Sequence, residues 1–256
     1  MNGLVRLLAG VSPEWAKRPL RAGRRLLQSL PYRGTERVCP ICNGESSRFA
    51  PFGTPTRDEG RCIHCDSLER HRFLWLYLTM CTDLFDGRHK RMLHVAPEPC
   101  FVPRFEARLG RDYLTADLAN PRAMLRMDIE DIQFPDAAFD VIYCSHVLEH
   151  VRDDRRAMRE FRRVLKPDGW AILLVPIMSD ATFEDESIVD PAERLKAFGD
   201  ETHVRRYGPD YADRLRESGF EARITAVPDM FGPEERLRMG LSPASGEIFH
   251  CTGQPV

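Results

Sequence analysis

Two features are missing from the sequence: a long apolar run and an excess of charge of one sign. No stretch approaches the roughly eighteen apolar residues that a membrane-spanning helix needs, so we expect no membrane span. The chain carries 37 basic and 39 acidic residues, which gives a formal net charge of -2. This balance excludes a global field that would draw the whole chain onto nucleic acid or an anionic membrane.

A convincing secretory leader is also lacking. The opening segment MNGLVRLLAGV is apolar, but Arg6 interrupts it and no convincing small-residue cleavage site follows. Of the eight cysteines, four form two C-x-x-C pairs and four stand singly, which favours metal ligands and free thiols over disulfides. We therefore expect a cytoplasmic protein. Its 43% of apolar residues suffice for one α/β domain with a small appendage.

Residues 1–35 form a basic segment in which arginines alternate with leucines. The leucine spacing predicts an amphipathic helix at residues 17–29, which ends before Pro31. One interpretation is a surface for the phosphate groups of nucleic acid or lipid. The other, which we favour, is a helix packed on the main domain with its arginines in solvent, because charged faces are the normal exterior of a helix.

Residues 36–66 carry the two cysteine pairs, separated by nineteen residues. This spacing is typical of a zinc ribbon, in which two tight turns each present two thiolates to one tetrahedral ion. Gly44 favours such a turn because glycine readily adopts positive φ, and His64 is expected to be an exposed turn residue. Four filled positions indicate structural zinc. The predicted ligands are Cys39, Cys42, Cys62 and Cys65.

The next segment, residues 67–84, is predicted to link the ribbon to the main domain through a helix at residues 67–80. Asp66 and Glu69 form a capping-box pattern at its start. Its apolar residues lie nearly all round the helix, which predicts that it is buried.

From residue 91 the sequence alternates strand-like and helical segments. Such alternation predicts βαβ crossovers and a mostly parallel sheet. The last two strand-like segments are expected to pair as antiparallel edge strands. The strand-like segments are 92–96, 113–117, 125–128, 139–145, 170–176, 220–227 and 247–252. The helical segments between them are 101–109 and 152–165.

The segment FDVIYCSHVLEH, residues 139–150, marks the expected functional site. Its apolar run ends in polar Ser145 and His146, and a helix-period segment follows. A buried parallel strand whose carboxyl end opens into a site has this pattern. In open α/β sheets ligands bind outside the carboxyl ends of the strands, so we expect the chemistry near Ser145 and His146.

The longer segment FDVIYCSHVLEHVRDDRRAMREFRRVLKPDGWAILLVP closely resembles the fourth strand, following helix and fifth strand of class I S-adenosylmethionine-dependent methyltransferases of the type 11 group. The resemblance covers roughly residues 90–180. HVAPE, SLERHR and KAFGDETHVRRYG resemble a narrower bacterial subgroup with a zinc ribbon in front. The resemblance implies an α/β fold with a seven-stranded, mostly parallel sheet, helices on both faces and an antiparallel last strand. The methyltransferase domain would span residues 85–256.

The resemblance also implies an S-adenosylmethionine site at the carboxyl ends of the first four strands. Asp117 matches the acid that binds the ribose hydroxyls, whose two oxygens suit two vicinal hydroxyls. Asp128 and Ile129 match the pair beside the adenine, and Ser145 and His146 stand at the methionine end. The full set of cofactor-binding candidates is His94, Ala96, Glu98, Asp117, Leu118, Asp128, Ile129, Ser145 and His146.

The loop after the first strand departs from the family pattern. Most members have an acid-x-Gly-x-Gly-x-Gly loop, but residues 94–100 here read HVAPEPC. Glycines there let the backbone approach the cofactor closely. Our hypothesis is that Glu98 supplies the missing negative charge for the methionine ammonium. The alternative is a non-catalytic, zinc-stabilised binding protein on a degenerate methyltransferase fold.

Histidines are the candidates for catalysis, because transfer to a hydroxyl requires the loss of a proton. His146 lies nearest the expected methyl group, whereas His150 is interpreted as structural. His203 lies in the insertion of residues 178–207, which is predicted to be a substrate lid, with Asp185 as a weaker partner. The other interpretation of this insertion is a solvated surface loop.

Together these patterns predict an enzyme that transfers a methyl group from S-adenosylmethionine to a small-molecule or saccharide acceptor, through a hydroxyl. One alternative is an RNA methyltransferase that holds RNA with its zinc ribbon and arginine-rich start. The near-neutral net charge argues against it.

Overall fold

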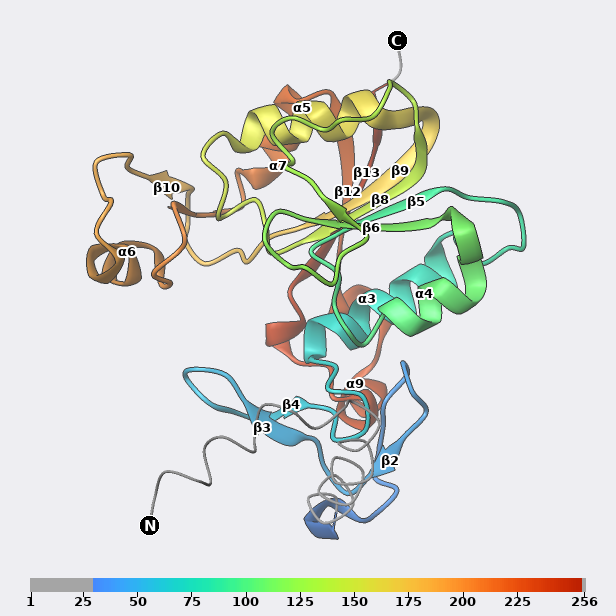
Figure 1. Ribbon diagram of the computed structural model, residues 1–256. Coiled ribbons are helices and arrows are strands. Elements are labelled where there is room, and N and C mark those ends of the chain that lie inside the picture. Colours follow the sequence, from blue (N-terminus) through green and yellow to red (C-terminus); the bar gives the residue numbers. More distant parts are fainter. Residues whose placement is uncertain (1–29, 255–256) are drawn as a thin grey trace, which may run out of the picture.

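The structure, a computed structural model, describes residues 30–254, and the helix predicted at residues 17–29 lies outside this range. Its main sheet lies above a small cysteine-bearing module in the view of Figure 1. None of the helices in residues 30–254 combines the length and apolar character that crossing a membrane requires.

Seven strands form the central sheet in the order β12-β13-β9-β8-β5-β6-β7. The strands from β9 to β7 pair in parallel, and β13 runs antiparallel to both β9 and β12. The predicted fold class is therefore confirmed. The strands are β5 (Met92–Val95), β6 (Tyr113–Asp117), β7 (Leu125–Arg126), β8 (Phe139–Ser145), β9 (Leu165–Leu174), β12 (Phe220–Ala226) and β13 (Glu247–Gly253).

Two strand predictions need correction. The last two strands do pair antiparallel, but only β12 is an edge strand, because β13 lies between β12 and β9. The fifth parallel strand, β9, begins at Leu165 instead of Trp170, and its pairing with β8 is irregular near Asp140. Gly169 permits this close approach, since a Cβ there would lie 2.7 Å from the Asp140 carbonyl oxygen.

Helices cover both faces of the sheet, with α5 and α7 on one face and α3 and α4 on the other (Figure 1). The apolar face of α5 is fully buried, as its sequence period predicts. The helices are α3 (Glu69–Cys81), α4 (Val102–Leu109), α5 (Asp154–Val164), α6 (Pro191–Phe198), α7 (Tyr211–Glu217), α8 (Val227–Met230) and α9 (Pro233–Met239).

Helix α3 begins differently from the capping box that the sequence predicts. The backbone N–H of Leu68 donates to Nδ1 of His71 at 3.1 Å, so a histidine closes the first turn. Glu69 instead forms an ion pair with Arg57 at 2.7 Å. The predicted burial of the helix is confirmed, with Phe73 fully enclosed.

The cysteine-bearing module consists of two short antiparallel pairs and is joined to the domain by the buried Arg72. Arg72 is fully buried, and its guanidinium donates to the carbonyls of Met239 at 2.9 Å and Gly240 at 2.7 Å. It also donates to the Gly60 carbonyl of the module at 3.2 Å and to the Ser67 carbonyl at 3.0 Å. Arg72 therefore ties the module to the end of α9. The module's strands are β1 (Arg37–Val38), β2 (Glu45–Ser46), β3 (Ala50–Phe52) and β4 (Arg57–Arg61).

The insertion after β9 contains β10 (Phe183–Glu184), α6 and β11 (Arg205–Arg206), and it extends away from the sheet in Figure 1. A buried network anchors its base. Arg205 and Arg214 both bond Glu184, at 2.9 Å and 2.8 Å. Arg214 also pairs with Asp154 of α5 at 3.0 Å, and the Tyr207 hydroxyl donates to the same carboxylate at 2.7 Å. The insertion is thus fixed to the start of α5.

Candidate functional site

The carboxyl ends of β7, β6, β5 and β8 lie side by side at one edge of the sheet, because these strands are parallel neighbours. Every predicted cofactor-binding residue except His94 lies at the end of one of these strands or in the turn that follows it. His94 lies within β5.

The loop after β5 adopts a glycine-like backbone although it lacks glycine. Ala96 has φ of 52°, in the left-handed region that glycine favours, and its N–H donates to the Ala116 carbonyl at 2.9 Å. His146, just past β8, also has positive φ, at 56°. Strained backbone of this kind concentrates at functional sites. Two neighbouring strands therefore end in strained residues at the same edge.

Glu98 is held by a chain of buried hydrogen bonds at the end of β5. His94 is fully buried, and its Nε2 lies 2.6 Å from Oε2 of Glu98. The Tyr143 hydroxyl donates to Oε1 of Glu98 at 2.6 Å, and the Tyr113 hydroxyl lies 2.6 Å from Nδ1 of His94. His94 thus lies beneath Glu98 and supports it.

The Glu98 carboxyl remains ionised in this setting. Burial alone would raise its pKa, but the hydrogen bond and charge of His94 outweigh burial, so the pKa falls below its usual range. His71, with Nε2 3.9 Å from Oε1 of Glu98, has its pKa lowered to about 3 by burial and is neutral at neutral pH. The loop therefore presents a fixed negative charge.

The ends of β6 and β7 carry the next candidates. One oxygen of Asp117 accepts the N–H groups of Ala119 and Asn120, both at 2.8 Å, which shapes the turn after β6. Leu118 beside it is 56% exposed and offers an apolar surface, whereas Ile129 is 4% exposed and faces the core. Two residues after β7 ends, the Asp128 carboxylate accepts a hydrogen bond from the N–H of Glu130 at 2.9 Å.

The end of β8 gathers buried polar atoms without partners. Among the described residues, Ser145 Oγ and both carboxylate oxygens of Glu149 are buried and form no hydrogen bond. His146 is half-buried, with Nδ1 3.2 Å from Oε1 of Glu149 but not in hydrogen-bond geometry. Unsatisfied buried groups of this kind call for an explanation such as a bound ion or ligand.

The insertion brings His203 to the loop after β8. Its ring packs edge-on against His150, with centroids 4.7 Å apart at 79°, and burial lowers its pKa. Asp185, predicted as a weaker partner, instead closes a turn by accepting from Ser187. Glu149 has no role in the expectations drawn from the sequence, although the H-x-x-E-H spacing of residues 146–150 was the available signal.

A hollow of about 680 Å³ lies between the β3–β4 hairpin and the start of α3. His71 lines this hollow, and its Nε2 lies 3.9 Å from Glu98, so the hollow borders the loop after β5. The lining residues are Pro51, Phe52, Gly53, Thr56, Arg61, Asp66, Leu68 and His71.

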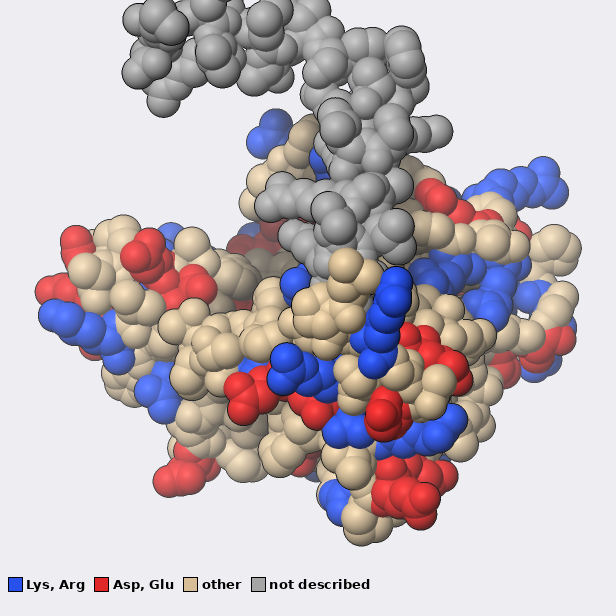
Figure 2. All heavy atoms as spheres, turned by 90° about the horizontal axis from the view of Figure 1, so that it is seen from below, with Lys and Arg blue, Asp and Glu red and all other residues tan. Residues whose placement is uncertain are grey.

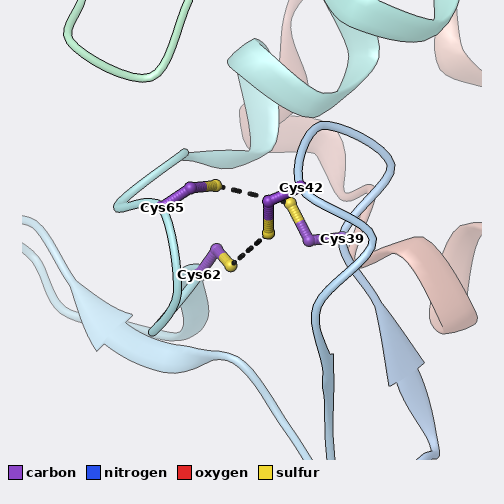
Figure 3. A group of neighbouring side chains, drawn as sticks. All are labelled: Cys39, Cys42, Cys62 and Cys65. Carbon is purple, nitrogen blue, oxygen red and sulfur yellow. Dashed lines mark hydrogen bonds between the residues drawn. The ribbon is translucent and has the colours of Figure 1, made fainter. Parts of the chain in front are cut away.

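The four predicted zinc ligands converge in the module (Figure 3). Sγ of Cys39 lies 3.7 Å from Sγ of Cys65, and Sγ of Cys42 lies 3.8 Å from Sγ of Cys62. Four thiolates at the usual zinc–sulfur distance stand about 3.8 Å apart in a tetrahedron. The spacing of the sulfur atoms therefore fits one zinc ion, which remains a prediction.

The two cysteine turns are built alike. In each, the N–H of the residue after the second cysteine donates to the carbonyl of the first, and that residue has positive φ: Asn43 at 56° and Asp66 at 60°. Gly44 is needed for a different reason from the one that the sequence suggested. A Cβ there would lie 2.3 Å from the ring of His64, which is exposed as expected.

Comparison with known proteins places residues 82–173 in a match to the family model described as a methyltransferase domain. The chain is 40% identical over 76 residues to the uncharacterized methyltransferase YcgJ of Bacillus subtilis, covering 30% of this chain and 28% of that protein. It is 30% identical over 105 residues to malonyl-[acyl-carrier protein] O-methyltransferase of Halorhodospira halophila, covering 40% and 33%.

A third similar protein is 27-O-demethylrifamycin SV methyltransferase of Amycolatopsis mediterranei, 34% identical over 98 residues, with 37% and 34% of the two chains covered. The chain thus spans about a third of the length of the curated relatives that it matches. Over these residues, and in its strand order, the chain is similar to class I methyltransferases.

Solved structures with a similar arrangement include 1,6-didemethyltoxoflavin-N1-methyltransferase of Burkholderia thailandensis, at TM-score 0.46 and 15% identity, covering 73% of this chain and 87% of that one. Phosphoethanolamine N-methyltransferase 2 of Haemonchus contortus has TM-score 0.49 and 12% identity, with 72% and 53% covered.

Proposed function

We propose that this protein transfers the methyl group of S-adenosylmethionine to a hydroxyl oxygen of a small-molecule acceptor, a class that includes saccharides. The observation that carries the proposal is the row of acidic residues at adjacent strand ends. Glu98 follows β5, Asp117 ends β6 and Asp128 follows β7. In open α/β sheets this edge is where ligands bind.

The residues at the edge suit the chemical groups of the cofactor. The ionised Glu98 carboxylate suits the methionine ammonium, and Asp117 suits vicinal ribose hydroxyls. The exposed Leu118 side chain would be covered by the adenine ring, which removes apolar surface from water. The Oγ of Ser145 is buried and forms no hydrogen bond with the described residues, so it can donate to the methionine end of the cofactor. The bound cofactor supplies an electrophilic methyl group.

The histidines at the end of β8 favour an acceptor that loses a proton. His146 and His203 both lie beside Glu149, at the strand end next to the proposed methionine site. An imidazole nitrogen can accept the proton of an acceptor hydroxyl. By their names, some similar proteins methylate oxygen and others methylate carbon or nitrogen, so the oxygen acceptor rests on the histidines.

The ribbon offers little for the RNA alternative. Three of its arginines form ion pairs with carboxylates. The pairs are Arg37 with Glu59 at 2.7 Å, Arg57 with Glu69 at 2.7 Å and Arg61 with Asp66 at 2.6 Å. Figure 2, which views the molecule from below, shows basic and acidic side chains interspersed over the described part of this face. Phosphate binding requires a concentrated positive surface.

Calorimetry with S-adenosylmethionine and its demethylated product tests the proposal. We expect both to bind, and we expect Glu98→Gln to weaken S-adenosylmethionine at least about tenfold, or about 1.4 kcal/mol. The matched control is Glu106→Gln, an exposed site on α4, which should bind as the wild type does. Absence of binding to the wild-type protein would overturn the proposed function, and unchanged affinity in Glu98→Gln would remove the role of that residue.

A further inference from the structure

Glu149, His150 and His203 form a cluster beside the proposed site of methyl transfer. One potential ligand atom from each lies within 4.8 Å of the others. Glu149 and His150 come from the turn after β8, and His203 comes from the insertion after β9. The proposed cofactor contacts use none of the three.

Among the described residues, the buried Glu149 carboxylate has one charged neighbour, His146, and no hydrogen bond. Glu149 is 1% exposed, and neither oxygen forms a hydrogen bond. Nδ1 of His203 is also buried without a partner. A buried carboxylate is costly unless it is paired, hydrogen-bonded or bound to a metal. His146 lies 3.2 Å from Oε1 without forming a hydrogen bond, so a cation held between Glu149 and the histidines would satisfy the carboxylate.

The hydrogen bonds of Thr202 leave one ring nitrogen of His150 available to bind a metal ion. The Thr202 hydroxyl donates its only proton to Asp200 at 2.6 Å, and its oxygen lies 3.0 Å from Nδ1 of His150. Nδ1 must therefore carry the proton and donate to Thr202, which leaves Nε2 of the neutral ring with a free lone pair. Outer partners of this kind set the tautomer of metal-binding histidines.

The backbone fixes the two halves of the cluster to each other. The N–H of Val204 donates to the Glu149 carbonyl at 2.9 Å, and Arg205 donates to the Leu148 carbonyl at 2.7 Å. The two donors directly follow His203 in the chain, so they hold this residue against the turn after β8. The cluster is therefore built by the fold and does not depend on a chance approach of mobile side chains.

We propose that Glu149, His150 and His203 bind one divalent transition-metal ion. Two imidazoles and one carboxylate suit ions such as Mn²⁺, Fe²⁺, Co²⁺ or Zn²⁺, and they leave coordination positions open for oxygen ligands. The site differs in kind from the cysteine cluster, whose four thiolates would fill a tetrahedral ion.

The open positions suit the acceptor hydroxyl, an assignment that rests on the proposed function. Coordination lowers the pKa of the hydroxyl, whose proton passes to water. The acceptor oxygen then forms a bond to the methyl carbon with its own electron pair, while the bond from that carbon to sulfur breaks and its electrons stay on sulfur. In this arrangement His203 is a metal ligand in place of the base role described under the proposed function, because water takes the proton.

Manganese titration of the full-length protein, followed by electron paramagnetic resonance, tests the site. Mn²⁺ is the probe because thiolate clusters select softer metals, so the cysteine module does not compete. We expect one Mn²⁺ per chain. Glu149→Gln should lower the affinity at least tenfold, whereas Glu186→Gln, the same change at an exposed position of the insertion, should leave it unchanged.

Thermal unfolding separates ligation from loss of fold. Without metal, Glu149→Gln should unfold at or above the wild-type temperature, since it removes a buried charge that forms no hydrogen bond. Mn²⁺ should raise the unfolding temperature of the wild type and of Glu186→Gln only. His203→Gln provides a second variant, with the same expected loss of Mn²⁺. Absence of Mn²⁺ binding by the wild type, or wild-type affinity in both ligand variants, would overturn the proposal.

Calorimetry distinguishes this failure from failure of the proposed function. Binding of S-adenosylmethionine without binding of Mn²⁺ would reject the metal site alone. Binding of Mn²⁺ without binding of S-adenosylmethionine would support the metal site and reject the proposed methyl transfer.

Discussion

The cysteine cluster and the cluster of Glu149, His150 and His203 bring metal-ligand side chains together in opposite ways. Each cysteine pair lies within one tight turn, and the two turns have the same hydrogen-bond pattern and a positive-φ residue in the same place. The second cluster joins a turn after β8 to an insertion more than fifty residues further along the chain. Local geometry builds the first cluster, whereas the sheet and the anchored insertion build the second.

This difference predicts how each cluster responds to change. The module has few apolar residues of its own, so metal would hold it together, and removal of one thiolate should affect its folding. The second cluster rests on a framework that folds for other reasons, and removal of one ligand there should affect binding more than stability. The following predictions run from the largest expected effect to the smallest.

Cys62→Ser should have the largest effect, because it removes one of four predicted zinc ligands. Structural zinc contributes on the order of 10 kcal/mol to the folding of small zinc peptides, so we expect loss of zinc and unfolding of residues 37–66. Elemental analysis and limited proteolysis would measure both. Cys81→Ser changes an exposed cysteine outside the cluster and should be silent. A variant that kept its zinc and its protease resistance would show that Cys62 is not a ligand.

Arg72→Met should loosen the attachment of the module without removing its metal. The change leaves the carbonyls of Ser67, Met239 and Gly240 without their charged donor, which should cost about 3 kcal/mol. Chemical denaturation would measure the loss, and Arg88→Met, on a side chain that is 74% exposed, is the control. Equal stability of the two variants would contradict this role for Arg72.

Acid should release the insertion that carries His203. Hydrogen bonds from Arg214, with a smaller contribution from Arg205, lower the pKa of Glu184 from 4.5 to about 2. Because the folded-state pKa is the lower one, the stabilisation is fully present above about pH 4.5 and is lost as the pH falls toward 2.

Protection of amides from exchange in residues 178–207, measured relative to their intrinsic exchange rates between pH 5 and pH 3, would detect this release. Glu184→Gln should be less protected than the wild type at pH 5 and should lose this part of the pH dependence. A variant whose protection falls with acid as steeply as that of the wild type would show that another group controls the insertion.

Ala96→Gly should have the smallest effect, a gain in stability of up to about 1 kcal/mol. Alanine at φ of 52° is strained, and glycine is not. Ala107→Gly, within α4, is the control and should lose about 1 kcal/mol, because glycine weakens a helix. Thermal unfolding would measure both. A loss of stability in Ala96→Gly would mean that the loop after β5 is not strained.

The sequence predicted those parts of the fold that short-range patterns determine. The bounds of β6 and β8 match their predictions because both strands are apolar runs that end in polar residues. The cysteine pairs converge as expected because their geometry lies within two turns. The interior place of β13 could not be predicted, since strand order depends on packing between segments far apart in the sequence.

The candidate site was predictable in part. Asp117, Asp128 and Ser145 lie where the strand ends indicated, but whether they bind the cofactor stays a prediction. Glu149 received no role because a carboxylate in a turn after a strand is usually in solvent. Only the fold shows that both of its oxygens are buried beside His203.

The contacts of Arg72 have a consequence for the order in which the chain is made. Its acceptors at Met239 and Gly240 lie 167 and 168 residues further along the chain. On the ribosome, the cysteine module and α3 are complete long before these carbonyls exist. The arginine must therefore wait, exposed or with temporary partners, until 168 further residues have been synthesised. The contact between module and domain thus closes long after the module itself has been made.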